Sequence, residues 1–254
     1  MIGILLAGLV AASAATGPTC PTDPKAPAVA PVIGVEAKGG LAFGKVNYKD
    51  RVGLGDHELA LTFDDGPDDD HTLAVLDILD RHCIKATFFL VGQEVDNAPQ
   101  IVREIARRGH TLGSHTYSHP ESLPALPLAE AEAEIDKGFA ANARALKDAP
   151  PEDQAHLARF FRFPELVDSA PLLEALKARD ITVMGADYGF DDWTDLPSDE
   201  LYRRAIAYTE ERRRGVIVMH DFNPQMIAML DHMITTLEER GYHFVQIVQS
   251  TARN

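Results

Sequence analysis

Short apolar runs alternate with longer amphipathic segments over most of the chain, from residue 59 to residue 248. Compact apolar runs predict buried strands, whereas apolar positions spaced three or four apart predict helices. The expected strands are residues 59–63, 86–91, 111–114, 159–162, 181–186, 215–219 and 243–248. The expected helices are residues 72–82, 98–108, 128–147, 170–178, 199–213 and 225–240. This regular exchange is typical of β/α units around a largely parallel sheet, so the pattern predicts an α/β fold.

Two adjacent carboxylates interrupt this pattern where the first of these strands ends. Leu59, Leu61 and Phe63 predict a buried strand, and the Gly-Pro pair after Asp64 and Asp65 predicts a turn. Two like charges at a buried strand end repel each other, so a metal ion or an arginine is needed to keep both ionised. The alternative is an Asx-type turn with two solvated acids.

Other polar residues follow several of the remaining strands. They are His115, Arg162, Asp187 and His220, which join Asp64 and Asp65 at five strand ends. In α/β sheets and barrels the loops at the carboxyl ends of the strands converge on one cleft. We therefore expect a functional site at this edge of the sheet.

A pair of histidines, His115 and His119, lies just after one of these strands. If the segment forms a helical turn, both rings face the same side. Together with Asp65 they offer two nitrogens and one oxygen, a ligand set that suits Zn²⁺ and leaves positions open for water and substrate. A solvated helix face is the alternative interpretation of the pair.

Composition and charge narrow the class of protein. The chain has 254 residues, of which 45% are hydrophobic and 25% charged, as in folded globular proteins. Its net charge of -15 argues against sequence-independent nucleic-acid binding, because too few basic residues are present to neutralise phosphates. The oligomeric state cannot be read from the sequence.

The N-terminal part differs from the rest of the chain. Residues 1–14 are apolar and end in Ala-Ser-Ala, which predicts a cleaved signal peptide. The protein is then expected to be secreted or periplasmic and to have no membrane span in its mature form. A retained N-terminal anchor is the alternative. Residues 15–45 are expected to be a proline-rich linker or extension. The folded domain is expected to begin after residue 40 and to occupy residues 46–254. The only two cysteines, Cys20 and Cys83, can pair in an oxidising compartment, but the sequence does not decide whether they do.

Five segments in order along the chain resemble the polysaccharide deacetylases with the NodB homology domain, carbohydrate esterase family 4. They are residues 62–67 (TFDDGP), 114–120 (SHTYSHP), 162–164 (RFP), 191–193 (DDW) and 216–220 (VIVMH). The resemblance implies a distorted (β/α) barrel with fewer strands than eight, in agreement with the seven strands expected above.

The resemblance also implies roles for individual residues in the removal of acetyl groups from N-acetylhexosamine units of a chitin-like or peptidoglycan-like glycan. Asp65, His115 and His119 correspond to ligands of a divalent metal, most simply Zn²⁺, with Co²⁺ or Ni²⁺ as alternatives. Asp64 corresponds to the general base and Arg162 to its partner. His220 corresponds to the general acid and Asp192 to the carboxylate that raises the pKa of this histidine.

Substrate contacts are less uniform. The resemblance places Trp193 and Met219 as the apolar wall for the acetyl methyl group, beside Pro164 and Glu165 of the arginine segment. Glu165 stands where many members have an aromatic residue, which changes the surface offered to a sugar and adds a carboxylate near the cleft. Two other functions stay open, an esterase that removes O-acetyl groups from xylan and a catalytically inactive glycan-binding relative.

Overall fold

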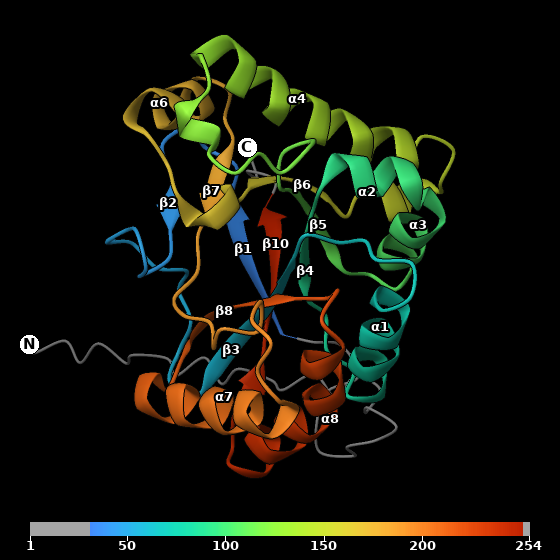
Figure 1. The fold of residues 1–254 in the computed structure, drawn as a ribbon, viewed down its shortest axis with the longest axis vertical. Helices are drawn as coiled ribbons and strands as arrows, with labels where there is room; N and C mark the ends of the chain where they lie inside the picture. The colour runs from blue at the N-terminus through green and yellow to red at the C-terminus, as the bar shows by residue number, and fades with distance from the viewer. Residues whose placement is uncertain (1–30, 251–254) are drawn as a thin grey trace, which may run out of the picture.

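Parallel strands form the centre of the structure, a computed structural model that describes residues 31–250 (Figure 1). Seven strands lie in the order β2-β7-β6-β5-β4-β3-β8 and curve into an open half-barrel in which every pair is parallel. They are β2 (Ala42–Phe43), β3 (Glu58–Asp64), β4 (Thr87–Leu90), β5 (Thr111–Ser114), β6 (Leu157–Phe161), β7 (Thr182–Met184) and β8 (Gly215–His220). The predicted α/β fold with a distorted barrel of seven parallel strands is confirmed.

A second, two-stranded parallel ribbon crosses the middle of the half-barrel (Figure 1). It pairs β1 (Val32–Glu36) with β10 (Gln246–Ser250), and Val32 lies opposite Gln246. Val35 and Ile247 pack in one hydrophobic cluster with residues of the half-barrel such as Phe160. The expectation that the folded part begins after residue 40 is therefore wrong, since β1 already belongs to it. Local periodicity cannot reveal β1, because its partner strand β10 lies at the far end of the described chain.

The last expected strand, residues 243–248, is divided between the two sheets. The short β9 (His243–Phe244) pairs with β3, and β10 then pairs with β1. Val245 lies between β9 and β10, and its N–H donates to the carbonyl of Leu59. One apolar run thus joins the half-barrel to the inner ribbon.

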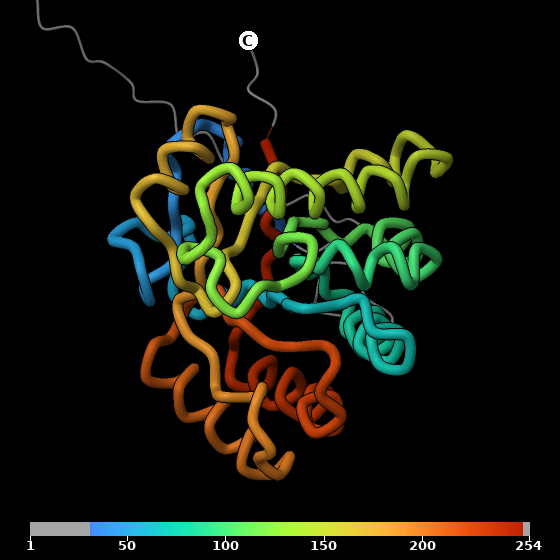
Figure 2. Tube along the Cα trace, turned by 45° about the horizontal axis from the view of Figure 1, so that its top comes forward, coloured from blue at the N-terminus to red at the C-terminus, as the bar shows by residue number. Residues whose placement is uncertain are grey.

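Helices cover the outside of the half-barrel (Figure 2). They are α1 (Thr72–Arg81), α2 (Gly92–Asn97), α3 (Pro99–Arg107), α4 (Leu128–Ala145), α5 (Pro151–Gln154), α6 (Ala170–Ala178), α7 (Ser198–Arg212) and α8 (Pro224–Glu239), with 3₁₀ turns at Leu123–Ala125 and Pro164–Leu166. The six expected helices are all present, and the short α2 and α5 were not expected. No helix among residues 31–250 combines the length and apolar character needed to cross a bilayer.

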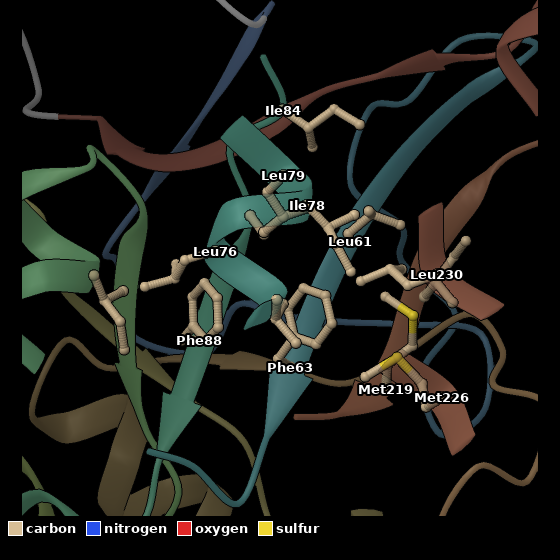
Figure 3. Close-up of a cluster of buried hydrophobic side chains, with 14 of the residues drawn as sticks. Leu61, Phe63, Leu76, Ile78, Leu79, Ile84, Phe88, Met219, Met226 and Leu230 are labelled. Carbon is tan, nitrogen blue, oxygen red and sulfur yellow. The ribbon is translucent and has the colours of Figure 1, made fainter. Parts of the chain in front are cut away.

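The packing between strands and helices explains why the apolar runs are continuous. Leu61 and Phe63 of β3 belong to one hydrophobic cluster with Leu76 of α1 and Met226 of α8 (Figure 3), and all are almost fully buried. Parallel strands covered on both faces need this continuous apolar character. Each such side chain contributes about 1.5–3 kcal/mol by burial, which holds the strand ends in a fixed arrangement.

Two N-terminal predictions concern residues that the structure does not describe. The expected signal peptide lies entirely outside the described residues, as does Cys20. Cys83 follows α1 and is not a free thiol. These predictions stay predictions.

Candidate active site

A cavity of about 180 Å³ opens at the carboxyl ends of the strands. Its walls come from the ends of β3 and β8 and from the loops that follow β3, β5, β6 and β7. The lining residues are Asp64, Asp65, His115, His119, Phe163, Glu165, Leu166, Trp193, Val218 and His220. Residues from five of the sequence motifs therefore meet in one place.

Asp64, the last residue of β3, is held by a buried arginine. Its Oδ1 accepts a hydrogen bond of 2.7 Å from Nη1 of Arg162, and the side chain of Arg162 is completely buried. The same guanidinium donates to Oγ1 of Thr62 at 2.7 Å and, through Nε and Nη2, to the carbonyls of Met184 and Gly185 at 2.8 Å each. This set of hydrogen bonds fixes the carboxylate of Asp64 and supplies the positive charge that its burial requires.

Asp65 faces a different partner set, because the backbone turns sharply after β3. Its φ of 74° lies in the left-handed region, and its Oδ1 is buried without a hydrogen bond. Instead, Nε2 of His115 and Nε2 of His119 lie 3.4 Å and 3.3 Å from this oxygen. Thr116 and His119 also have positive φ values, so the segment after β5 is a tight turn and not the expected helical one.

The three groups fit a divalent metal ion. Their ligand atoms all lie within 4.8 Å of one another, and the orphaned oxygen of Asp65 belongs to this set. Nδ1 of His115 lies 2.8 Å from the carbonyl oxygen of Arg162, which can only accept, so Nδ1 carries the proton and Nε2 is free to coordinate. Two imidazoles and a carboxylate form the donor set of many zinc sites.

Electrostatics keep Asp65 ionised even without a cation. Burial alone would raise the pKa of its carboxyl, but the interaction with His115 and the charges of His220 and His119 lower the pKa to about 2. The pKa of His115 is raised overall. Burial alone would lower this pKa, but Asp64, Asp65 and the carbonyl of Arg162 together outweigh the effect of burial. The cluster thus presents a permanent carboxylate to any cation that enters.

His220, at the end of β8, lies on the other side of the cavity. Its Nδ1 is 3.1 Å from Oδ1 of Asp192, and its backbone N–H donates to Oδ2 of the same residue at 2.7 Å. Asp192 is fully buried, and Asn223 at the start of α8 donates to its backbone carbonyl. Burial alone would lower the pKa of His220, but the hydrogen bond and charge of Asp192, with Asp64 and Asp65, raise it to about 9. His220 is therefore positively charged at neutral pH.

Two of the expected substrate contacts lie in the cavity and two do not. Trp193, which is 54% exposed, and Glu165 both line it. Met219 was expected in the apolar wall, but this is wrong, because alternation along β8 points Met219 into the core, where Figure 3 shows it beside Met226. Pro164 is buried and is not among the lining residues.

Asp187 was expected to join the functional site at this edge of the sheet, and this prediction is also wrong. Its carboxylate accepts hydrogen bonds from the backbone N–H groups of Lys45 and Val216. The chain after β7 turns aside to the beginning of β8, where the N–H of Asp187 donates to the carbonyl of Val216. Asp187 therefore fastens the open side of the half-barrel and takes no part in the cavity.

Sequence reasoning missed three lining residues, Phe163, Leu166 and Val218. Val218 lies two positions before His220 on the same strand, so the strand period alone would have placed it on the same face. Phe163 belongs to the arginine segment, whereas nothing in the local pattern distinguishes Leu166.

Comparisons with known proteins agree with this arrangement. Residues 51–184 match the family model described as polysaccharide deacetylase. A chitooligosaccharide deacetylase of Sinorhizobium fredii is 30% identical over 80% of this chain and 94% of its own length. A peptidoglycan-N-acetylglucosamine deacetylase of Bacillus cereus is 57% identical over 63 residues, which is 25% of this chain and 23% of that protein.

Among solved structures, a peptidoglycan deacetylase of Bdellovibrio bacteriovorus superposes with a TM-score of 0.76 at 26% identity. The match covers 88% of this chain and 60% of the Bdellovibrio chain. The order of the motifs, the half-barrel and these matches lead to one conclusion: the chain belongs to the polysaccharide deacetylase family, carbohydrate esterase family 4.

Proposed function

We propose that this protein is an exported, metal-dependent hydrolase that removes N-acetyl groups from N-acetylhexosamine units of a chitin-like or peptidoglycan-like glycan. The observation that carries the proposal is the meeting of a fixed carboxylate, a three-residue ligand set and a charged histidine around one cavity. Hydrolysis of an amide needs a proton acceptor for water, stabilisation of negative charge on the carbonyl oxygen, and a proton for the nitrogen that leaves.

Asp65, His115 and His119 would hold the metal, which we propose to be Zn²⁺, with Co²⁺ or Ni²⁺ as alternatives. When bound there, such an ion lowers the pKa of a water molecule and polarises a carbonyl group. Adjacent residues at a strand end point in different directions, so Asp64 can serve a different purpose from Asp65.

Asp64 is the proposed general base. The hydrogen bonds from Arg162 hold its carboxylate in one orientation while the residue still lines the cavity, so it can accept a proton from water. The water oxygen then bonds to the acetyl carbon, and the C–N bond breaks with its electron pair moving to nitrogen. His220, charged through Asp192, delivers the proton that makes this nitrogen an amine. Acetate leaves, Asp64 returns its proton to solvent, and His220 takes one up again.

Apolar side chains complete the site. Trp193, Leu166 and Val218 line the cavity beside His220, and the Trp193 and His220 rings form a T-shaped pair with a centroid distance of 5.8 Å. We propose that these side chains receive the acetyl methyl group and one face of the sugar.

Acetate release tests the proposal. The chelator-stripped protein is supplied with Zn²⁺, Co²⁺ or Ni²⁺ and incubated with chitooligosaccharides, peptidoglycan and O-acetylated xylan. We expect acetate from an N-acetylated glycan, lost on chelation and in Asp64→Asn, and retained in Asp148→Asn, an exposed carboxylate in the connection from α4 to β6. Activity that survives both chelation and Asp64→Asn would refute the mechanism. Release from xylan alone would favour the esterase, and saturable glycan binding without release under every metal would favour an inactive binding protein.

A further inference from the structure

Glu165 occupies the cavity wall in a way that the proposed mechanism does not use. It lies in the 3₁₀ turn Pro164–Leu166, directly after the segment that carries Arg162. Both Glu165 and Leu166 have φ values of 55°, and both line the cavity. Glu165 is also exposed to solvent, so its carboxylate stands at the opening and not at the buried base of the site.

The other two acids of the cavity wall have partners, whereas Glu165 has none among the described residues. Three acids line the walls, and Asp64 is paired with Arg162 at 2.7 Å. Asp65 lies within 3.9 Å of three imidazole nitrogens. Among residues 31–250, no hydrogen bond or ion pair involves Glu165, and none of the residues that line the cavity is a lysine or an arginine. Glu165 is therefore the one acid of the cavity wall without an ion-pair partner in the described part of the chain.

An exposed aromatic ring shares this opening. Trp193 is 54% exposed and lines the same cavity as Glu165. An unpaired carboxylate and the face of an indole both attract an ammonium group, the carboxylate through its charge and the indole through its quadrupole. A neutral acetamide gains nothing from the charge of Glu165, and an anionic sugar is repelled by it.

We propose that Glu165 makes this protein select glycans that already carry a free amino group next to the N-acetylhexosamine that reacts. The inference rests on the proposed deacetylase function, whose own product is such an ammonium-bearing sugar. A sugar deacetylated in one turnover then improves the binding of its neighbour in the next. The products are runs of adjacent deacetylated sugars.

The test compares two tetrasaccharides that differ in one group. One consists of four N-acetylglucosamine units, and the other has one internal unit already deacetylated. Wild-type protein is expected to show a higher kcat/KM for the amine-bearing substrate. Glu165→Gln, which keeps the size of the side chain and removes its charge, is expected to lower kcat/KM for this substrate by roughly two- to fivefold through KM, as for other solvent-exposed charge pairs, and to lower kcat/KM for the fully acetylated substrate by a smaller factor. The difference in kcat/KM between wild type and Glu165→Gln should vanish at about 0.5 M salt.

Two further variants keep the result unambiguous. Glu165→Lys is expected to reverse the preference, whereas Asp148→Asn removes the same charge at an exposed position that does not line the cavity, and it should change kcat/KM for neither substrate. An equal effect of Glu165→Gln on both substrates would overturn the proposal, as would an effect of Asp148→Asn as large as that of Glu165→Gln.

Binding separates this inference from the proposed function. The affinity of the two tetrasaccharides for wild type and Glu165→Gln can be measured by calorimetry in chelator, without turnover. Weaker binding of the amine-bearing tetramer to Glu165→Gln, with no acetate released by any preparation, supports the role of Glu165 and refutes the deacetylase. Acetate release with equal binding of both tetramers to both proteins refutes the role of Glu165 and leaves the deacetylase standing.

Discussion

Replacing Arg162 by methionine removes the only guanidinium that touches Asp64 in the described part of the chain. Methionine fills part of the same volume without a charge or a donor. The substitution leaves the carboxylate of Asp64, which is only 3% exposed, without its counter-charge. It also removes donors from Oγ1 of Thr62 and from the carbonyls of Met184 and Gly185.

The magnitude follows from these contacts. Breaking a buried ion pair by removing one partner costs about 3–5 kcal/mol of the free energy of unfolding, because an uncompensated charge stays behind. Carbonyls and hydroxyls that lose a donor in the interior add about 1 kcal/mol each where water cannot replace it. Most of the loss in Arg162→Met should therefore come from the charge on Asp64.

The double variant Arg162→Met with Asp64→Asn isolates this charge. We expect it to recover about 2 kcal/mol or more relative to the sum of the two single variants, because neither charge is then buried alone. Urea unfolding in chelator, followed by far-UV circular dichroism, measures all three variants without interference from metal binding. Arg159→Met is the matched control, since Arg159 lies on β6 three residues before Arg162, is exposed, and bonds only to the backbone carbonyls of Arg179 and Asp180 through its side chain. Strict additivity of the single variants would refute the reasoning.

Three other predictions concern separate parts of the molecule. His115→Gln is expected to weaken Zn²⁺ binding at least about tenfold in a titration against a competing chelator, and undiminished binding would refute the ligand assignment. Asp192→Asn removes the group that raises the pKa of His220 to about 9, so protonated His220 is lost at a lower pH and the alkaline limb of the kcat profile should move down in pH; an unmoved limb would argue against His220 as the acid. Burial lowers the pKa of His82, but its hydrogen bond to Glu238 and the nearby acids raise this pKa overall. This histidine therefore stabilises the fold below its unfolded pKa of about 6.5, and the contribution is lost as the pH rises through the higher native pKa. His82→Gln should therefore lower Tm at about pH 5.5 and much less at about pH 9, and an equal loss at both would contradict this linkage.

The arrangement of strands and helices could be predicted because each element carries its own periodicity. The runs 59–63, 111–114 and 215–219 appear as strands within one residue of their expected ends. The inner ribbon could not be predicted in this way, because β1 becomes a strand only by pairing with β10. A short apolar segment beside prolines gives no local indication of such a partner.

The candidate site could also be predicted only in part. Asp65, His115 and His119 could be brought together from the sequence because they belong to motifs with fixed spacing. The direction in which a side chain points was harder to predict, as Met219 shows. The turn after β5 was also missed, since positive φ values at Thr116 and His119, and not a helix, bring the two imidazoles to the same oxygen.

The pairing of β1 with β10 ties the beginning of the described chain to its end, and this has a consequence for folding. During synthesis β1 emerges early, but its partner emerges only after every other strand of the half-barrel. Contacts so distant in sequence slow folding, so closure of the inner ribbon should be a late event. Proteolysis between β1 and β2 would release β1 and expose the edge of β10, whose unpaired backbone groups can then join another chain.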